Sequence, residues 1–266
     1  EINEVIIVDN GSQPELITIL SGFDSSFVSK IKIIRHKENT GVRPALNDIW
    51  KNATSEVIVF THNDVEFREK GWDEKVRKAF KKHPEAGIIG AYGAKGIGTQ
   101  DIYKVPYQMH QLARTKNVSN CDMDMEVHGF RNLENDFENV AVFDGFFMAI
   151  KKEVLDKIGG FSDILPQHHN MDNLICIQSI EKGYENIVIP LNIFHRGGMT
   201  DVGENWTKNF GKTKQQIHED AHPPLWEYGK GILPIYIEDI YSEGTQGICG
   251  YNLYINNQLI KTKIYD

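Results

Sequence analysis

The densest group of residues that could do chemistry is the segment 61–66, Thr-His-Asn-Asp-Val-Glu, which follows an apolar, β-branched run. Within five residues it holds His62, Asn63, Asp64 and Glu66. Oxygen ligands of this kind suit a hard divalent cation such as Mg²⁺ or Mn²⁺, and a cation there would neutralise a diphosphate leaving group. When this segment is considered by itself, a solvated turn with a capping aspartate explains it equally well.

Two further residues have types and positions that suit a reaction centre. His195 follows a buried strand pattern, and with a carboxylate beside it the imidazole would bind a metal ion and favour Mn²⁺ over Ca²⁺. Asp172 begins a helical pattern, and its carboxylate, ionised at neutral pH, could take a proton from a hydroxyl nucleophile. Structural roles stay open, because lone histidines are more often structural and an acidic residue favours a helix start.

The helix start at 39–47, Asn-Thr-Gly-Val-Arg-Pro-Ala-Leu-Asn, could bind a phosphate. Its Arg43 can pair with a phosphate, and the N-terminus of a helix favours anions. The segment is neither a Walker loop nor a Gly-x-Gly-x-x-Gly fingerprint, and the sequence contains no Gly-x-Ser-x-Gly elbow.

Alternating strand and helix patterns position these residues. Apolar runs predict strands at 4–12, 30–36, 56–67, 86–92, 140–150 and 186–195. Helical periodicity predicts helices at 14–20, 43–53, 71–83, 151–161 and 171–184. This alternation is typical of an α/β sheet, in which ligands bind beyond the carboxyl ends of the strands. Asp9 and the residues 62–64 fall at such ends.

Two segments depart from the alternation. Residues 93–139 are rich in Gly, Asp, Asn, Met and His and predict a long, partly irregular insertion. Residues 199–266 form a C-terminal extension, in which the alternating segment 250–264 with its Asn-Asn pair predicts a β-hairpin.

Composition restricts the function classes. The chain has 266 residues with 29 Lys+Arg against 37 Asp+Glu, a net charge of −8, which argues against nucleic-acid binding. Three scattered cysteines indicate reduced thiols in a cytoplasmic protein, and neither a membrane-spanning apolar run nor a leader peptide is predicted.

Five segments in order resemble glycosyltransferase family 2, whose members have the GT-A fold. They lie between residues 4 and 198 and read VIIVDNGS, NTGVRPALN, VIVFTHNDVEF followed by GW, VFDGFFMAIKKEVLDKIGGF, and MDNLICIQSIEKGYENIVIP followed by FH. The resemblance implies a GT-A-like, Rossmann-like α/β domain at 1–198, with a mixed, mostly parallel sheet flanked by helices. A small extension at 199–266 would add a helix and the hairpin.

The resemblance also implies an activity and a set of residues. The reaction is inverting transfer of a sugar from a nucleotide-diphosphate sugar to a hydroxyl, with Asp172 as base and with Asp64 and His195 as ligands of Mn²⁺ or Mg²⁺. Asp9 is expected to bind the nucleoside of the donor. The full set of residues expected to bind the donor is Asp9, Asn10, Asn39, Gly41, Arg43, Asn63, Asp144 and Gly145.

The resemblance further implies a UDP- or dTDP-sugar as donor, a saccharide or glycolipid as acceptor, and surface polysaccharide synthesis as pathway. Acceptor contacts are expected in the insertion, at Tyr103, Tyr107, His110, Arg114 and His128, which ordinary loop packing explains as well. Trp206, Phe210 and Trp226 either attach the chain to the inner face of a membrane or pack the extension onto the domain.

The sequence departs from the family pattern in three places. His62 replaces the first aspartate of Asp-x-Asp, Leu174 replaces an acidic residue two after the base, and the family's first strand and helix are missing, which suggests truncation. A non-catalytic, sugar-nucleotide-binding homologue therefore remains an alternative. A nucleotidyltransferase is a second, although Asp-Asn-Gly-Ser-Gln-Pro-Glu lacks that class's Gly-rich signature with a basic residue.

Overall fold

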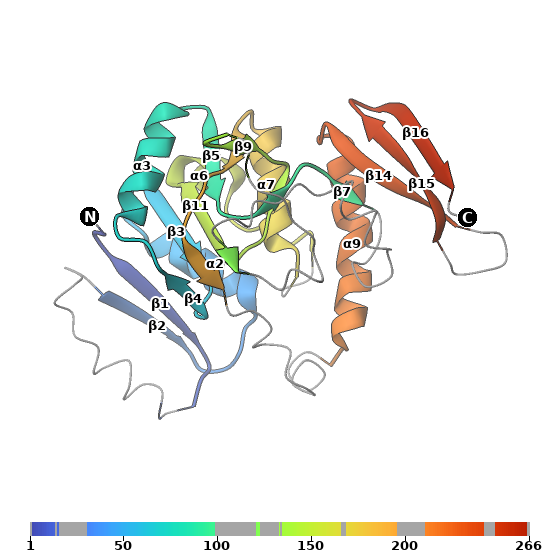
Figure 1. Ribbon diagram of the computed structural model, residues 1–266. Helices are drawn as coiled ribbons and strands as arrows, with labels where there is room; N and C mark the ends of the chain where they lie inside the picture. The colour runs from blue at the N-terminus through green and yellow to red at the C-terminus, as the bar shows by residue number, and fades with distance from the viewer. Residues whose placement is uncertain are drawn as a thin grey trace.

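A five-stranded mixed sheet forms the centre of the computed structural model (Figure 1). The structure describes residues 2–13, 15, 31–98, 121–122, 133, 135–165, 169–195, 211–241 and 248–264. The strand order is β3 (Val57–Thr61), β11 (Phe147–Lys151), β5 (Ala86–Gly90), β12 (Glu185–Val188) and β9 (Glu138–Asn139). β3, β5 and β12 run in one direction, and β11 and β9 run in the other.

Both faces of this sheet are covered by other elements of the chain. Successive side chains of its inner strands point to opposite faces, so apolar residues are needed at both sets of positions. On one face, Ile88 and Ile150 pack with residues of α6 (Lys152–Ile158) and α7 (Met171–Glu181). On the other, Ile89 and Phe147 pack with Val76 and Phe80 of α3 (Trp72–Lys82). The result is a three-layer α/β/α arrangement (Figure 1).

A parallel pair, β1 (Val5–Asn10) and β2 (Ile31–His36), places Asp9 opposite Arg35. The helix α2 (Val42–Asn52), predicted at 43–53, packs against β1. Glu4 accepts hydrogen bonds from the backbone of Thr54 at 2.7 Å and of Ser55 at 3.1 Å, which joins the start of β1 to the start of β3. The helix predicted at 14–20 lies, apart from residue 15, outside the described residues.

The strand predicted at 56–67 is in fact two strands, which is a correction to the sequence analysis. β3 ends at Thr61, the polar residues 62–64 turn, and β4 (Val65–Phe67) joins a separate sheet with the order β4-β13-β8. The pair predicted at 186–195 divides in the same way, because β13 (Ile193–His195) pairs antiparallel with β4. β8 is Cys121–Asp122. His195 consequently lies opposite Val65, next to Asp64.

The break expected in the strand at 140–150 is present. β10 (Val142–Phe143) pairs with β6 (Gly93–Ala94), and β11 begins at Phe147. Asp144 and Gly145 therefore lie in a short connection at the end of the sheet, where the backbone N–H of Asp144 donates to the carbonyl of Tyr92 at 3.1 Å.

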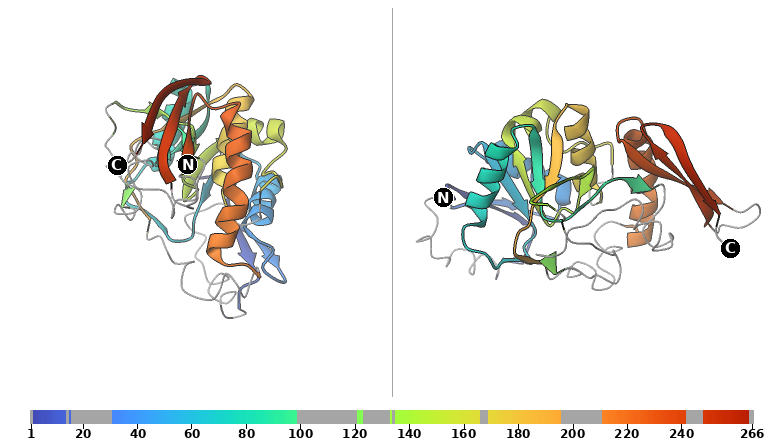
Figure 2. Two further views of the ribbon diagram at one scale, coloured as in Figure 1. Left: turned by 90° about the vertical axis from the view of Figure 1, so that its right-hand side faces the viewer. Right: turned by 45° about the horizontal axis from the view of Figure 1, so that its top comes forward.

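The C-terminal segment forms the helix α9 (Lys214–Lys230) and a sheet beside it (Figure 2). The strands of this sheet are β16 (Gln258–Ile264), β15 (Ile248–Ile255), β14 (Ile235–Tyr241) and β7 (Ile97–Gly98), in that order. Asn256 and Asn257 have positive φ values of 50° and 61°, as a two-residue hairpin turn requires. The predicted hairpin is therefore confirmed.

Trp226 of α9 belongs to the same buried core as Ile88 and Ile150. It is 7% exposed, and its indole N–H donates to the carbonyl of Ile237 at 2.9 Å. Of the two roles considered for Trp226, packing is the one observed. Trp206 and Phe210 lie outside the described residues.

Two adjacent glycines end α6 and allow a clean stability test. Gly159 and Gly160 have φ values of 90° and 86°, but only Gly160 is enclosed: an added Cβ would lie 2.3 Å from Cζ3 of Trp50 on α2. Left-handed backbone costs a side chain about 1–2 kcal/mol, and overpacking adds about 1–3 kcal/mol. We expect Gly160→Ala to lower the free energy of unfolding by about 2–5 kcal/mol in urea titrations. Gly159→Ala is the matched control and should lose only the smaller, conformational part; equal losses would contradict the packing argument.

Candidate active site

Three side chains that can ligate a metal ion converge where β3, β4 and β13 meet. One ligand atom each from His62, Asp64 and His195 lies within 4.8 Å of the others. Nε2 of His195 is 3.2 Å from Oδ1 of Asp64 and 3.3 Å from Nδ1 of His62. We call these three residues the HDH cluster. Its members come from the turn after β3 and from the end of β13, which the pairing of β13 with β4 holds side by side.

His195 is the fixed member of the cluster. Its ring is 9% exposed and stacks on Phe146 with centroids 4.7 Å apart and planes 13° from parallel. Burial lowers the pKa of His195, while the carboxylates of Asp144 and Asp64 act in the opposite direction. A lowered pKa keeps the imidazole neutral near pH 7, which is the form that binds metals.

The HDH cluster offers two imidazole nitrogens and one carboxylate, a donor set that suits Mn²⁺ and related divalent ions. The sequence analysis predicted Asp64 and His195 as ligands but took His62 only as a departure from Asp-x-Asp. The overlooked signal is the spacing: His62 and Asp64 are two residues apart in one turn, so both side chains can face the same point.

Asp172, the predicted base, lies against the connection between β10 and β11. Its Oδ2 accepts from the backbone N–H of Gly145 at 2.8 Å, and its Oδ1 accepts from that of Asn173 at 2.9 Å. An added Cβ on Gly145 would lie 3.1 Å from Oδ2 of Asp172, so the absence of a side chain permits this approach. Burial, and next the charge of Asp144, raise the pKa of Asp172 to about 6.

Asp144 connects the two groups of residues. Its charge acts on the pKa of Asp172 and on that of His195, so it lies within electrostatic range of both. Its Oδ1 accepts from the backbone N–H of Phe146 at 3.2 Å, which holds the carboxylate at the strand break. Through Asp144, the HDH cluster and Asp172 are electrostatically linked.

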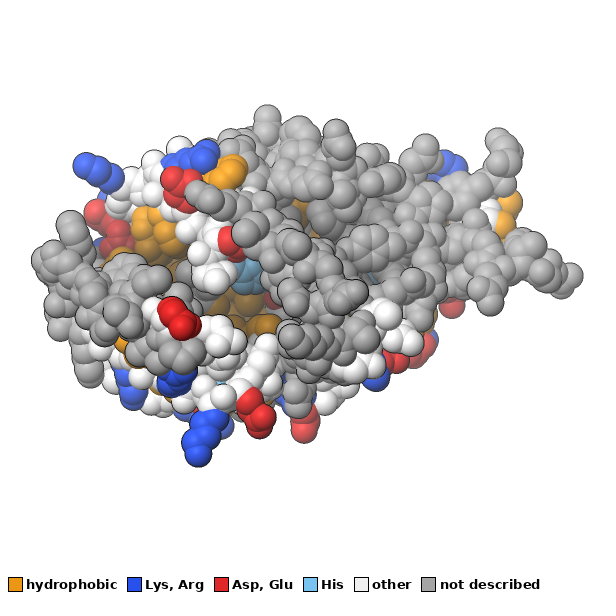
Figure 3. All heavy atoms as spheres, turned by 90° about the horizontal axis from the view of Figure 1, so that it is seen from below, with side chains coloured by type: hydrophobic (Ala, Val, Ile, Leu, Met, Phe, Trp, Pro, Cys, Tyr) orange, Lys and Arg blue, Asp and Glu red, His pale blue; other side chains and the backbone are white. Residues whose placement is uncertain are grey.

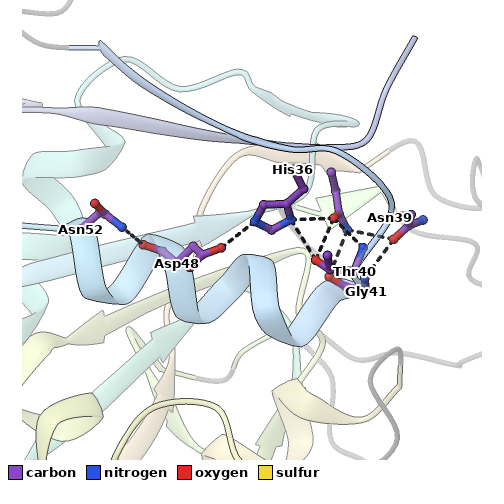
Figure 4. A network of polar contacts seen from close by, with 7 residues as sticks. His36, Asn39, Thr40, Gly41, Asp48 and Asn52 are labelled. Atoms are coloured by element: carbon purple, nitrogen blue, oxygen red, sulfur yellow. Dashed lines mark hydrogen bonds and ion pairs between the residues drawn. The ribbon is translucent and has the colours of Figure 1, made fainter.

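Three of the predicted donor-binding residues, Asn10, Asn39 and Gly41, bind one another. Figure 4 labels Asn39 and Gly41 in this network. The side-chain amide of Asn10 donates to Oδ1 of Asn39 and to the carbonyl of Gly41, each at 3.0 Å. Oδ1 of Asn10 accepts from the backbone N–H of Thr40 at 3.0 Å and lies 2.9 Å from Nδ1 of His36. These contacts shape the loop that begins α2. The side-chain amide of Asn10 donates its hydrogen bonds within this loop, to Asn39 and Gly41.

The other predicted donor-binding residues are more dispersed. Asp9 is 4% exposed, accepts from the backbone N–H of Ser12 at 2.9 Å, and lies 3.5 Å from Nε of Arg35. Hydrogen bonds from Ser12 hold the pKa of Asp9 below its usual value. Arg43 donates to the carbonyl of Leu165 at 3.3 Å. Asn63 is exposed.

The remaining predictions for this region concern the acceptor and the membrane. Tyr103, Tyr107, His110, Arg114 and His128 lie outside the described residues. Seen from below, the molecule has histidine side chains in a hollow beside acidic and hydrophobic ones (Figure 3). None of the described helices is both long and apolar enough to span a lipid bilayer.

Two solved structures align with this chain. GalNAc-T7, solved with UDP, GalNAc and Mn²⁺, aligns over 72% of this chain and 37% of its own with a TM-score of 0.52 at 13% identity. Mannosyltransferase PcManGT from Pyrobaculum calidifontis, in complex with GDP-Man and Mn²⁺, aligns over 87% and 63% with a TM-score of 0.49 at 17% identity. At these identities the likeness to GalNAc-T7 supports the GT-A fold.

A curated relative is the uncharacterized glycosyltransferase YfnE of Bacillus subtilis (strain 168), 24% identical over 202 residues, or 73% of this chain. The chain spans about half of that relative, 48% of its length. The family described as "Glycosyl transferase family 2" matches residues 1–159, more than half of the 266 residues, and includes β1, α2, the turn at 62–64 and the Asp144–Gly145 connection. The chain thus belongs to glycosyl transferase family 2.

Proposed function

We propose that this chain transfers a sugar, with inversion, from a nucleotide-diphosphate sugar to an acceptor hydroxyl in a metal-dependent reaction. The observation that carries the proposal is the HDH cluster, with Asp172 linked to it electrostatically through Asp144. A metal site together with a half-buried carboxylate supplies the two things that such a transfer needs: a place for the diphosphate and a base for the attacking hydroxyl.

The residues of the HDH cluster fit a divalent metal ion. Three donor atoms already lie within 4.8 Å of one another, and the buried, neutral imidazole of His195 needs no proton removed before it binds. Mn²⁺ suits this mixture of imidazole and carboxylate better than Mg²⁺, which prefers oxygen ligands. A bound cation would neutralise the charge that develops on the departing diphosphate.

Asp172 is the proposed base. The N–H groups of Gly145 and Asn173 fix both of its oxygens, so the carboxylate is oriented before an acceptor arrives. Its pKa of about 6 lies close to working pH, which makes the carboxylate basic enough to accept a proton yet mostly ionised at pH 7. The acceptor hydroxyl would lose its proton to Asp172 as its oxygen bonds to the anomeric carbon and the diphosphate leaves from the opposite side.

The donor would lie between the HDH cluster and the loop that begins α2. Asp9 is the proposed nucleoside contact, and Asn39, Gly41, Arg43, Asn63, Asp144 and Gly145 are proposed around the donor; Asn10 would act by shaping the loop. A UDP- or dTDP-sugar is the proposed donor, and GalNAc-T7, which shares the fold, was solved with UDP. A saccharide or glycolipid acceptor, surface polysaccharide synthesis, and action in the cytoplasm, at the inner face of the membrane, complete the proposal.

A thermal-shift panel of UDP-, GDP-, dTDP- and CMP-sugars, each with and without Mn²⁺, tests the proposal. A ligand at 100 times its Kd stabilises the native state by about 2.7 kcal/mol. We expect a clear rise in Tm with one nucleotide class, and only with Mn²⁺. Equal stabilisation with and without metal would contradict the metal-dependent site, while stabilisation without sugar transfer to any acceptor would favour a non-catalytic, sugar-nucleotide-binding protein.

A further inference from the structure

His36 lies where the end of β2 meets the loop that begins α2 (Figure 4). Its Nε2 atom is 2.7 Å from Oδ2 of Asp48, which lies on α2. Its Nδ1 atom is 2.9 Å from Oδ1 of Asn10, at the end of β1, and 2.8 Å from Oγ1 of Thr40 in the loop. Both ring nitrogens therefore have partners, and one side chain joins two strands, the loop and the helix.

The orientation of the Asn10 side chain decides which of its atoms faces His36. Its amide nitrogen donates to the carbonyl of Gly41 at 3.0 Å, and its Oδ1 accepts from the backbone N–H of Thr40 at 3.0 Å. A backbone carbonyl only accepts and a backbone N–H only donates, so exchanging the oxygen and nitrogen of this amide would break both bonds. The atom of Asn10 that faces His36 is therefore the oxygen, which only accepts hydrogen bonds.

Hydrogen-bond acceptors thus lie at both ring nitrogens of His36, the carboxylate of Asp48 at Nε2 and the side-chain oxygen of Asn10 at Nδ1. A neutral imidazole has a single N–H and can donate to one of them, whereas an imidazolium has two and donates to both. The hydroxyl of Thr40 fits the charged form, because it accepts from Nδ1 and donates to Oδ1 of Asn10 at 3.0 Å. The geometry therefore favours the imidazolium.

The charges around His36 agree with a cation at this place. Asp48 on α2 forms an ion pair with the protonated ring. Asp9 on β1 is within electrostatic range, because hydrogen bonds from Ser12, and after them the charges of Arg35 and His36, lower the pKa of Asp9. Arg35, the neighbouring cation on β2, lies 3.5 Å from the carboxylate of Asp9 and is itself paired.

We propose that His36, carrying both ring protons, is a positioning residue for the nucleotide-sugar donor. It holds Asn10 and Thr40, and through them the loop that begins α2, in the shape that receives the donor. This inference rests on the proposed function, which places the donor beside that loop. Without the imidazole, the contact that ties the loop to α2 through Asp48 is lost, and the loop has to be ordered when the donor binds. Such a cost lowers the affinity for the donor rather than the rate of the chemical step.

Two measurements on the full chain without nucleotide test the state of the loop. In nitrogen NMR of the chain with labelled histidine, the two ring nitrogens of an imidazolium resonate close together and those of a neutral ring far apart. We expect the imidazolium pattern for His36 at neutral pH, in the signals that His36→Gln removes. Hydrogen exchange of the Thr40 amide should be at least about tenfold faster in His36→Gln, because a hydrogen bond to a charged group is worth that much.

The matched control is His83→Gln. His83 ends α3, its side chain is 12% exposed against 15% for His36, and its Nδ1 lies 3.3 Å from Oε1 of Glu85. It is therefore a histidine of similar burial beside a carboxylate, but on another element. Its replacement should leave both the exchange of the Thr40 amide and the nucleotide affinity unchanged.

Titrations with UDP, dTDP and GDP in saturating Mn²⁺ test the consequence for the donor. For the nucleotide that binds wild type most tightly, Kd should rise at least about tenfold in His36→Gln. The rate of transfer at saturating donor should change less than about threefold, as expected for a loss of ground-state positioning. Asp48→Asn, which keeps the ring but removes its anionic partner, should raise Kd by a smaller factor.

A neutral His36 ring, equal exchange of the Thr40 amide in wild type and His36→Gln, or an unchanged nucleotide affinity would each overturn the proposal. A residue with a structural role alone would lower Tm without changing this affinity. Thermal melts establish that each variant is folded, and if His36→Gln does not fold, Asp48→Asn carries the comparison. If wild type binds none of the three nucleotides, the proposed function fails, whereas the NMR and exchange measurements still decide whether His36 holds the loop.

Discussion

Asp172→Asn is expected to lower the rate of sugar transfer by about 10³-fold while nucleotide-sugar binding changes little, because general-base catalysis typically contributes about 10²–10⁴-fold. The amide keeps the size of the carboxylate and retains an oxygen to accept from Gly145 or Asn173. It cannot take the acceptor's proton at any working pH. Turnover with saturating donor and acceptor, together with the Mn²⁺-dependent thermal shift, measures the two quantities separately.

The pKa of Asp172 adds a pH signature to this prediction. A base with a pKa of about 6 gives a transfer rate that falls as the pH drops below about 6, and a bound cation would move this limb lower because it favours the carboxylate. Stability changes in the opposite sense. Since the folded pKa lies above the model value of 3.8, ionisation of Asp172 removes up to about 3 kcal/mol of stability as the pH rises from about 4 through 6.

The stability of Asp172→Asn relative to that of wild type should therefore be greater at pH 8 than at pH 5. Asp163→Asn is a suitable control for transfer, because Asp163 is an exposed acid on the same stretch of chain. Near-wild-type turnover in Asp172→Asn would show that another group is the base. A stability difference independent of pH would show that Asp172 does not titrate in this range.

The sequence predicted the elements that depend on local pattern. Helices α2, α3 and α7 were expected because their apolar residues recur with helical spacing, and the turn at Asn256 and Asn257 because two such residues between alternating segments favour a tight hairpin. The break at Asp144 was expected from an Asp-Gly pair inside an apolar run.

The sequence did not predict what depends on distant pairing. The division of the segment 56–67 into β3 and β4 follows from β13, which is more than 120 residues away and pairs with β4 but not with β3. Without knowledge of that pairing, nothing in the sequence indicates that His62 lies close to His195. The bonds of Asn10 to Asn39 and Gly41 are likewise tertiary, and a residue's role as scaffold or ligand contact cannot be read from its type.

Asp64→Ala is expected to abolish the Mn²⁺-dependent thermal shift and to lower transfer at least about 10²-fold, since stabilisation of charge by a metal is worth several kcal/mol. Asp64 is the single carboxylate of the HDH cluster, and its side chain is 17% exposed at 3.2 Å from His195. Nucleotide-sugar binding measured at saturating Mn²⁺ should weaken, and Tm without ligand should change little. Glu66→Ala is the matched control, because Glu66 is an exposed acid two residues further on and pairs with Arg68.

His62→Ala then distinguishes the structure from the sequence pattern. One possibility is that His62 only replaces the family's donor-binding aspartate. Its loss should then weaken nucleotide binding equally with every metal and leave the dependence on Mn²⁺ concentration unchanged. Because its Nδ1 lies 3.3 Å from Nε2 of His195, we expect a ligand role instead. The Mn²⁺ concentration needed for half-maximal stabilisation should then rise at least about tenfold, as loss of a group at a metal site does. An unchanged Mn²⁺ requirement would remove His62 from the HDH cluster and leave Asp64 and His195 as the metal ligands.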